Sequence, residues 1–241
     1  MKANDNVKKD ICEFFDISEI EFETLVQNEK TLDEYFYTSG ETDLSYYEDI
    51  KYIPIALACY NDYSKNSCKA FAKYDNENPL MFSSIIDIGA GIGLTTLLLS
   101  LLFPKTKIIY QNIASKQKDY ATHILGDNII KTTELIQGDV AVCLEMFEHI
   151  KQPIDFLQKI IDECKPKYFL ISNSFRSKSY GHFSEYLVDG KLVSNTKIGR
   201  MFNNILRKNN YKVLKSFWNN RPCIWEKVIW KNFKNMWFTQ S

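Results

Sequence analysis

The sequence predicts a doubly wound α/β fold with a mostly parallel sheet, an antiparallel strand at one edge and an added N-terminal helical layer. From about residue 80 onward, short apolar runs alternate with helix-length amphipathic segments. This is the pattern of parallel strands joined by crossover helices. The last two apolar runs follow one another without a helix between them, which indicates an antiparallel addition at the sheet edge. We therefore divide the chain into an N-terminal helical lid or cap, residues 1–79, and an α/β domain, residues 80–241.

The N-terminal layer is predicted to contain two helical stretches. Apolar residues recur at helical spacing over residues 7–37 and again over 50–74, where Pro54 lies near the start. Residues 38–49 are mostly polar and include Ser-Gly, so we expect a loop there. The segment YDNENP at 74–79 has the composition of a linker.

Strands and helices alternate through the rest of the chain. Each predicted strand is a short apolar run, and each predicted helix carries its apolar residues on one face. The predicted strands cover residues 81–88, 107–113, 128–133, 140–144, 168–172, 211–218 and 223–229. The predicted helices cover residues 92–103, 115–125, 153–164 and 196–206. The last two strands are joined through the turn signal NNRP.

Composition predicts a folded, cytoplasmic protein without a membrane partner. The 241 residues are 45% hydrophobic and 25% charged, which excludes general disorder. Six cysteines without a Cys-x-x-Cys pair indicate neither a zinc ribbon nor a disulfide framework, and favour a reducing compartment. The longest apolar run, LLLSLLF at 97–103, is too short to span a bilayer. The first residues lack the apolar core of a signal peptide.

The charges are unevenly distributed along the chain. Residues 1–50 carry four lysines and fourteen acidic residues, whereas residues 176–241 carry thirteen basic and three acidic residues. Such asymmetry can mark an end that binds polyanions. However, only four of the thirty basic residues are Arg, the better phosphate ligand. We therefore favour packing of an acidic N-terminal layer near a basic C-terminal layer.

A glycine-rich loop is the most informative feature of the sequence. The stretch IIDIGAGIGLTTLLLS at 85–100 places Gly89, Gly91 and Gly93 between a predicted strand and a predicted helix, with Asp87 just ahead. Glycine has no Cβ, so it suits a sharp turn or a close approach of the backbone to a ligand. Ligands of open α/β sheets bind at the carboxyl ends of the strands. The loop therefore predicts a binding crevice.

The segment DIGAGIG resembles motif I of the class I S-adenosylmethionine-dependent methyltransferases. The resemblance continues through CLEMFEHI at 143–150 and QPIDFLQKIIDECKPKYFLISNS at 152–174, and covers about residues 80–230. It implies a Rossmann-like methyltransferase sheet and the cofactor S-adenosyl-L-methionine. It also implies transfer of a methyl group to an O or N atom of a small-molecule or modified-biomolecule acceptor.

The resemblance also implies a set of cofactor-binding residues. Asp87 would hold the cofactor's amino group, or would tie down the loop through backbone N–H groups. The acidic residue with which the family's second strand grips the ribose hydroxyls is replaced here by Asn112, which follows Gln111 and whose neutral amide is a weaker acceptor. The alternative is that Gln111 and Asn112 cap the strand of a protein that has lost the cofactor. Thr132 and Thr133 lie near the expected adenine contact. The implied set is Asp87, Gly89, Ala90, Gly91, Gly93, Gln111, Asn112, Leu144 and Glu145.

The pattern Glu-x-x-Glu-His after the fourth strand supplies candidate catalytic residues. Glu145, Glu148 and His149 stand at the mouth of the predicted crevice, and His182 follows the fifth strand. Three interpretations compete. Glu148 and His149 could be scaffold, or His149 or His182 could be the general base for the acceptor. In the third, Glu145, Glu148, His149 and His182 bind a divalent metal. We favour scaffold or base over metal, and take Glu148, His149 and His182 as the catalytic candidates.

Two other functions remain open. The Glu-x-x-Glu-His pattern with a distant His is similar to the small-RNA 3′-terminal 2′-O-methyltransferases, and the pattern itself to the ubiquinone-pathway O-methyltransferases. Together with the basic C-terminal third, this makes an RNA methyltransferase the runner-up, with nucleic acid as its partner. The weakened ribose position at Asn112 is the one hint of a non-catalytic, methyltransferase-like binding module. A small-molecule acceptor is the favoured partner.

Overall fold

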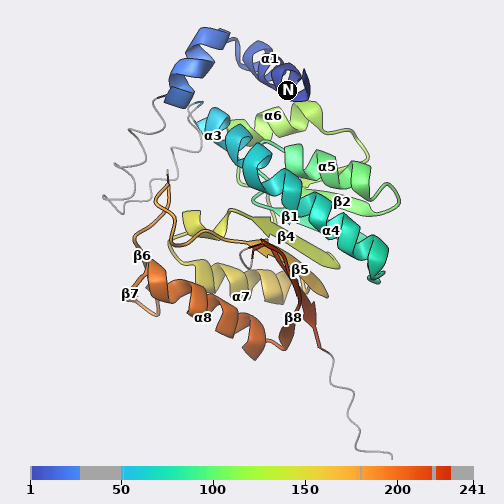
Figure 1. Cartoon of the computed structure of the whole chain (residues 1–241), viewed down its shortest axis with the longest axis vertical. Helices are drawn as coiled ribbons and strands as arrows, with labels where there is room; N and C mark the ends of the chain where they lie inside the picture. Colours follow the sequence, from blue (N-terminus) through green and yellow to red (C-terminus); the bar gives the residue numbers. More distant parts are fainter. Residues whose placement is uncertain (1, 28–49, 51, 180, 219–220, 229–241) are drawn as a thin grey trace, which may run out of the picture.

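The computed structural model of the whole chain describes all residues except 1, 28–49, 51, 180, 219–220 and 229–241 (Figure 1). The loop predicted over 38–49 therefore lies outside the described residues, as does the end of the helical stretch predicted over 7–37. In the described part of the chain, no helix is both long enough and apolar enough to cross a membrane.

A seven-stranded sheet forms the centre of the molecule, in the order β3-β2-β1-β4-β5-β9-β8. Strands β1 to β5 pair in parallel, whereas β9 pairs antiparallel with both β5 and β8. The doubly wound fold with an antiparallel addition at one edge is thus confirmed. The strands are β1 (Ser84–Ile88), β2 (Lys107–Gln111), β3 (Ile130–Thr132), β4 (Val140–Leu144), β5 (Tyr168–Ser172), β8 (Tyr211–Ser216) and β9 (Cys223–Lys227).

Helices cover both faces of this sheet (Figure 1). Successive residues of a strand point to opposite faces, so neighbours in β1 enter different cores. Ile85 packs with Phe71 and Leu99, whereas Ile86 packs with Leu157 and Phe202. The first core is closed by α4 (Lys65–Glu77), α5 (Leu94–Leu102) and α6 (Lys116–Ile124), and the second by α7 (Pro153–Glu163) and α8 (Asn195–Lys208).

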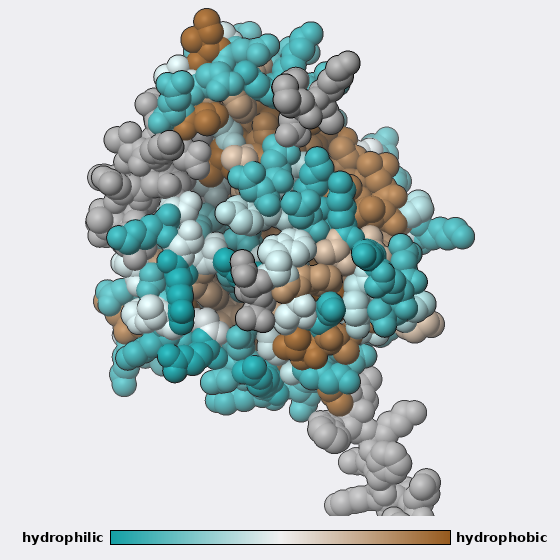
Figure 2. Space-filling view, in the orientation of Figure 1, coloured by the Kyte–Doolittle hydropathy of each residue, from teal (hydrophilic) through white to brown (hydrophobic). Residues whose placement is uncertain are grey.

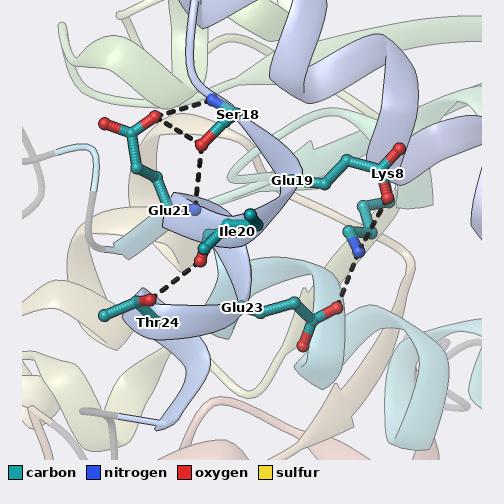
Figure 3. Close-up of polar contacts among 7 residues, drawn as sticks. All are labelled: Lys8, Ser18, Glu19, Ile20, Glu21, Glu23 and Thr24. Carbon is teal, nitrogen blue, oxygen red and sulfur yellow. Dashed lines mark hydrogen bonds and ion pairs between the residues drawn. The ribbon is translucent and has the colours of Figure 1, made fainter.

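The N-terminal helical stretch is broken after its first half. Helix α1 (Lys2–Phe15) ends at Asp16, which has a left-handed φ of 53°, and a further helix covers residues 19–27. Ser18 and Glu21 start this second helix with a reciprocal capping box: Glu21 N donates to Ser18 Oγ at 3.1 Å, and Ser18 N donates to Glu21 Oε2 at 2.7 Å (Figure 3). In the described residues, the helical stretch predicted over 7–37 thus forms two helices, because Ser-x-x-Glu is a strong helix start.

The two N-terminal helices are linked by Lys8, whose ammonium lies 2.7 Å from Glu23 and 3.1 Å from Glu19 (Figure 3). They form an apolar cluster with Ile92 and Leu94, which lie at the glycine loop, and with Tyr120 of α6. Helix α1 lies at the opposite end of the molecule from α8 (Figure 1). For the described helices, the expected packing of the acidic layer near the basic C-terminal layer is therefore wrong.

A long helical rod follows and lies along the sheet (Figure 1). It consists of α3 (Tyr52–Cys59), a π-helical turn η2 (Tyr60–Ser64) and α4. Helix α4 continues to Glu77, so most of the predicted linker over 74–79 is helical. Its end is fixed by Asp75, whose carboxylate accepts a hydrogen bond from Leu80 N at 2.8 Å. The domain boundary at residue 79 stays a prediction.

A two-stranded hairpin, β6 (Glu185–Val188) and β7 (Lys191–Ser194), lies between β5 and α8 and was not predicted. Its turn is Asp189-Gly190, with both residues at positive φ, as a two-residue type I′ turn requires. The surface seen in Figure 2 is mostly hydrophilic, with hydrophobic side chains gathered where Figure 1 places α5. Leu101 of that helix is 71% exposed.

Candidate active site

Two adjoining cavities open at the carboxyl ends of the parallel strands, where the sequence predicted a crevice. The larger has a volume of about 670 Å³ and extends from the ends of β2 and β3 to the start of α7. The smaller, of about 80 Å³, lies between the glycine loop and the α3–η2 rod. They share five lining residues: Tyr52, Gly89, Gly91, Gln117 and Glu145.

The glycine loop has the left-handed backbone conformation that glycine adopts without strain. Gly89, Gly91 and Gly93 have φ values of 66°, 53° and 81°. A Cβ at Gly91 would lie 2.8 Å from Gln117 Oε1, and one at Gly93 would lie 2.8 Å from the Cβ of Ala121. Gly93 lines neither cavity, so its observed role is to let α5 and α6 pack closely. Gly89 and Gly91 line both cavities.

Asp87 lies beneath this loop and lines the smaller cavity. It is 2% exposed, and its Oδ2 accepts a hydrogen bond from Thr96 Oγ1 at 2.6 Å. Burial raises the pKa of the Asp87 carboxyl to about 7, although the Thr96 hydrogen bond opposes this shift. The hydrogen bond thus ties Asp87 to α5. A cationic group in the smaller cavity would favour the charged form of Asp87 and so offset the effect of burial on its pKa.

Gln111 and Asn112, the two amide side chains at the end of β2, differ in how many hydrogen bonds they make within the protein. Gln111 is occupied at both ends, since its Oε1 accepts from Gly89 N at 3.3 Å and its Nε2 donates to Thr133 O at 3.0 Å. Asn112 lines the larger cavity, and its Nδ2 points at Gly91 O at 3.5 Å. That carbonyl also accepts from Tyr110 Oη at 2.8 Å. Asn112 is therefore the more available of the two for a ligand.

Other predicted cofactor residues are distributed over both cavities. Leu144 and Ala90 line the smaller one. Thr133 lines the larger cavity together with Glu134 and Leu135, which the sequence analysis did not single out. Thr132 instead accepts a hydrogen bond from Glu134 N at 2.9 Å.

The two glutamates of the Glu-x-x-Glu-His pattern meet at one serine. Ser174 Oγ lies 2.5 Å from Glu145 Oε2 and 2.5 Å from Glu148 Oε1, and Ser172 Oγ donates to Glu145 Oε1. A hydroxyl carries one hydrogen, so Ser174 donates to one carboxyl and accepts from the other, which must then be protonated. Burial and the adjacent Glu145 raise the pKa of Glu148 well above its ordinary value, so we assign the proton to Glu148.

The two histidines lie edge to face, with ring centroids 4.7 Å apart. His149 lines the larger cavity and is also 6.3 Å from the Tyr52 ring. Burial and the neighbouring His182 lower the pKa of His149 well below its usual value, and burial also lowers the pKa of His182. His182 Nδ1 lies 3.0 Å from Ser177 O. A carbonyl only accepts, so Nδ1 carries the hydrogen and Nε2 holds the free lone pair.

The structure thus brings the four residues of the pattern to one end of the crevice. Only Glu145 and His149 line a cavity, whereas Glu148 is fully buried and His182 is 6% exposed behind them. Among the described residues, no three His, Cys, Asp or Glu side chains are grouped so that they could hold a metal ion.

Besides Glu134 and Leu135, three further site residues were missed in the sequence. Tyr52 and Gln117 come from helices and carry no local motif, so only the packing of the fold identifies them. Ser174 could have been found, since Ser-Asn-Ser directly at the end of β5 places hydroxyls at the carboxyl edge of the sheet.

Comparison with known proteins identifies the fold. No family model and no curated protein sequence matches the chain. Among solved structures, the plantazolicin methyltransferase BpumL in complex with a monoazolic desmethylPZN analog and SAH aligns with a TM-score of 0.50 at 14% identity, over 80% of this chain and 84% of that chain. The same enzyme in complex with SAH gives 0.50 at 15% identity, over 79% and 82%. The N-terminal domain of EvdMO1 with SAH and D-fucose gives 0.47 at 13% identity, over 70% and 84%. The BpumL likeness shows that this chain has a methyltransferase fold.

Proposed function

We propose that this protein is an S-adenosylmethionine-dependent methyltransferase that acts on an O or N atom of a small-molecule or modified-biomolecule acceptor. One observation carries the proposal. A cavity runs from Asn112 and Glu134, past the glycine loop, to Glu145 and His149. A cofactor bound along the strand ends would therefore present its reacting end to a cluster of ionisable side chains. The shared fold with a methyltransferase crystallised with SAH supports it.

The chain's own groups suit the two ends of such a cofactor. Gly89 and Gly91 remove the side chains that would obstruct the backbone's approach to it. Asp87, buried beside the smaller cavity, offers a carboxylate to the amino group of the methionine moiety. Asn112 offers an amide to the ribose, and Thr133, Glu134 and Leu135 wall the region where the adenine would lie.

The acceptor end needs little beyond positioning and removal of a proton, because the sulfonium of the cofactor is already activated. His149 is the cavity-lining base candidate, and its lowered pKa keeps its imidazole neutral at pH 7. His182 lies behind it with Nε2 as the acceptor nitrogen. Glu148, protonated and buried, would hold the Ser174–Glu145 network in place. A cavity of about 670 Å³ has the size of small-molecule sites, so a small acceptor is favoured over RNA.

Calorimetry with S-adenosylhomocysteine tests the proposal. We expect the wild-type protein to bind, and Asp87→Ala and Gly91→Val to bind much more weakly. Valine at Gly91 would place a Cβ 2.8 Å from Gln117 Oε1 in a backbone with φ of 53°. Gly199→Ala is the control, since a Cβ there meets only Phe175 at 3.7 Å. A wild-type protein that does not bind at millimolar ligand would contradict the proposal and would favour the non-catalytic binding module.

A further inference from the structure

Gln117 is a buried amide that faces both cavities and has no assigned role. It is 4% exposed and lines the larger and the smaller cavity. Its Oε1 lies close enough to Gly91 to fill the space of a missing Cβ. Within the described part of the chain, the hydrogen bonds found leave its amide unused. A buried amide without a protein partner is costly unless a ligand or water satisfies it.

The position of Gln117 is fixed by the helix that carries it. Ser115 caps α6, its Oγ accepting from Lys118 N at 3.4 Å. The same helix is held from outside by Tyr120, which is 1% exposed and donates to Asp10 at 2.7 Å. Gln117 therefore lies in the first turn of a helix whose start is capped and whose outer side is hydrogen-bonded to α1.

The neighbouring Asn112 explains why a second amide is needed there. A ribose carries two adjacent hydroxyls, and one carboxylate can accept both of their hydrogens. Asn112 has a single acceptor oxygen, and its Nδ2 is directed at Gly91 O. Gln111 cannot supply the second acceptor, since both ends of its amide bind backbone. Gln117 lines the same cavity, and its Oε1 lies against Gly91, the residue that Asn112 also contacts.

From this juxtaposition we infer that Gln117 is a cofactor-positioning residue whose amide oxygen accepts one ribose hydroxyl while Asn112 accepts the other. Two neutral amides from β2 and α6 together replace a single carboxylate. The inference rests on the proposed function, because it assumes a nucleoside ligand in the larger cavity.

The experiment compares Gln117→Met and Gln117→Glu by calorimetry with S-adenosylhomocysteine and with its 2′-deoxy and 3′-deoxy analogues. Methionine keeps the length of the side chain and removes the acceptor. A neutral hydrogen bond is worth about 0.5–1.5 kcal/mol, so Gln117→Met should weaken binding of S-adenosylhomocysteine roughly two- to twelvefold. For the analogue that lacks the hydroxyl held by Gln117, the loss should vanish. Gln117→Glu retains an acceptor and should bind at least as tightly as the wild type.

A second substitution separates hydroxyl binding from a packing effect. Asn112→Asp supplies a carboxylate that can accept both hydroxyls, so it should restore binding in the Gln117→Met background. The control is Lys116→Ala, a change at an exposed residue of the same turn, which should leave binding unchanged. Wild-type affinity in Gln117→Met, or an equal loss for both deoxy analogues, would overturn the inference. A wild-type protein that does not bind S-adenosylhomocysteine would overturn the proposed function itself.

Discussion

Asp87 is a buried carboxyl that affects stability and, under the proposed function, ligand binding. Its pKa is about 7 in the folded protein, against an ordinary value of 3.8, because burial disfavours the charge. The folded state therefore binds more protons than the unfolded state between about pH 4 and pH 7. Stability consequently falls as the pH rises through that window, and the full penalty is present above it.

Asp87→Asn keeps the acceptor for Thr96 and removes the ionisable group. We expect this variant to be more stable than the wild type by roughly 2–4 kcal/mol at pH 8, with a smaller difference at pH 5. A cation beside Asp87 would restore its charge, so wild-type affinity for S-adenosylhomocysteine should rise from pH 6 to pH 8 and that of Asp87→Asn should not. Urea unfolding and calorimetry across this range measure both effects. A stability difference that does not change with pH would show that Asp87 is ionised throughout.

The histidine pair predicts the pH dependence of the reaction. The pKa of His149 is well below its ordinary value of 6.5 because of burial and His182. The neutral base therefore persists into acid solution, and the acid limb of the rate profile should lie below pH 6.5. Loss of the essential histidine should cost about 10²- to 10⁴-fold in rate and should abolish that limb, once a substrate screen has identified an acceptor.

The same assay distinguishes a base from a metal site. If a histidine is the base, a chelator leaves turnover unchanged and only one of His149→Ala and His182→Ala has a large effect. If Glu145, Glu148, His149 and His182 act as one metal-binding unit, each Ala substitution weakens metal binding. Recovery of chelator-treated protein with Mg, Mn or Zn, at one equivalent per chain, would contradict our choice of the base.

At the scale of elements, the backbone φ of a glycine decides whether its substitution by alanine raises or lowers stability. Gly190 in the β6–β7 turn has φ of 73° and open space around a Cβ, whereas Gly199 in α8 has only Phe175 at 3.7 Å. Gly190→Ala should destabilise the protein by about 1–3 kcal/mol through backbone strain alone. Gly199→Ala should stabilise it by about 0.5–1 kcal/mol. Urea midpoints measure both changes, and equal signs would mean that packing, and not φ, governs these positions.

The elements that the sequence predicted are those with a strong local period. Strands such as β1 and β4 were predicted because a parallel strand that is buried on both faces has a nearly continuous apolar sequence. This signal is visible without knowing which strands pair with it. The β6–β7 hairpin was missed although Val188-Asp189-Gly190-Lys191 is a hairpin signal, and the Ser18–Glu21 capping box was likewise overlooked. Gln117 could not be predicted, since its role depends on where α6 lies against the glycine loop.

At the scale of the whole molecule, the N-terminal helices share cores with the sheet. Phe71 and Cys68 of α4 are fully buried against Ile85 and Leu99. Helix α1 contributes Ile11, also fully buried, to the cluster beside the glycine loop. Removing α4 would expose one face of the sheet, whereas removing only the chain before α3 would expose the smaller cluster around Tyr120.

These contacts lead to a test of the boundary at residue 79. Full burial of a Phe side chain contributes about 1.5–3 kcal/mol, and a domain has only about 5–15 kcal/mol of stability. We therefore expect the fragment 80–241 to lack a cooperative urea transition, because it loses Phe71, Cys68 and the rest of α4. The fragment 50–241 retains the α3–η2–α4 rod and should unfold cooperatively, at a lower midpoint than the full chain. If 80–241 unfolds cooperatively and binds S-adenosylhomocysteine, then α4 belongs to a separate cap and the boundary at residue 79 is correct.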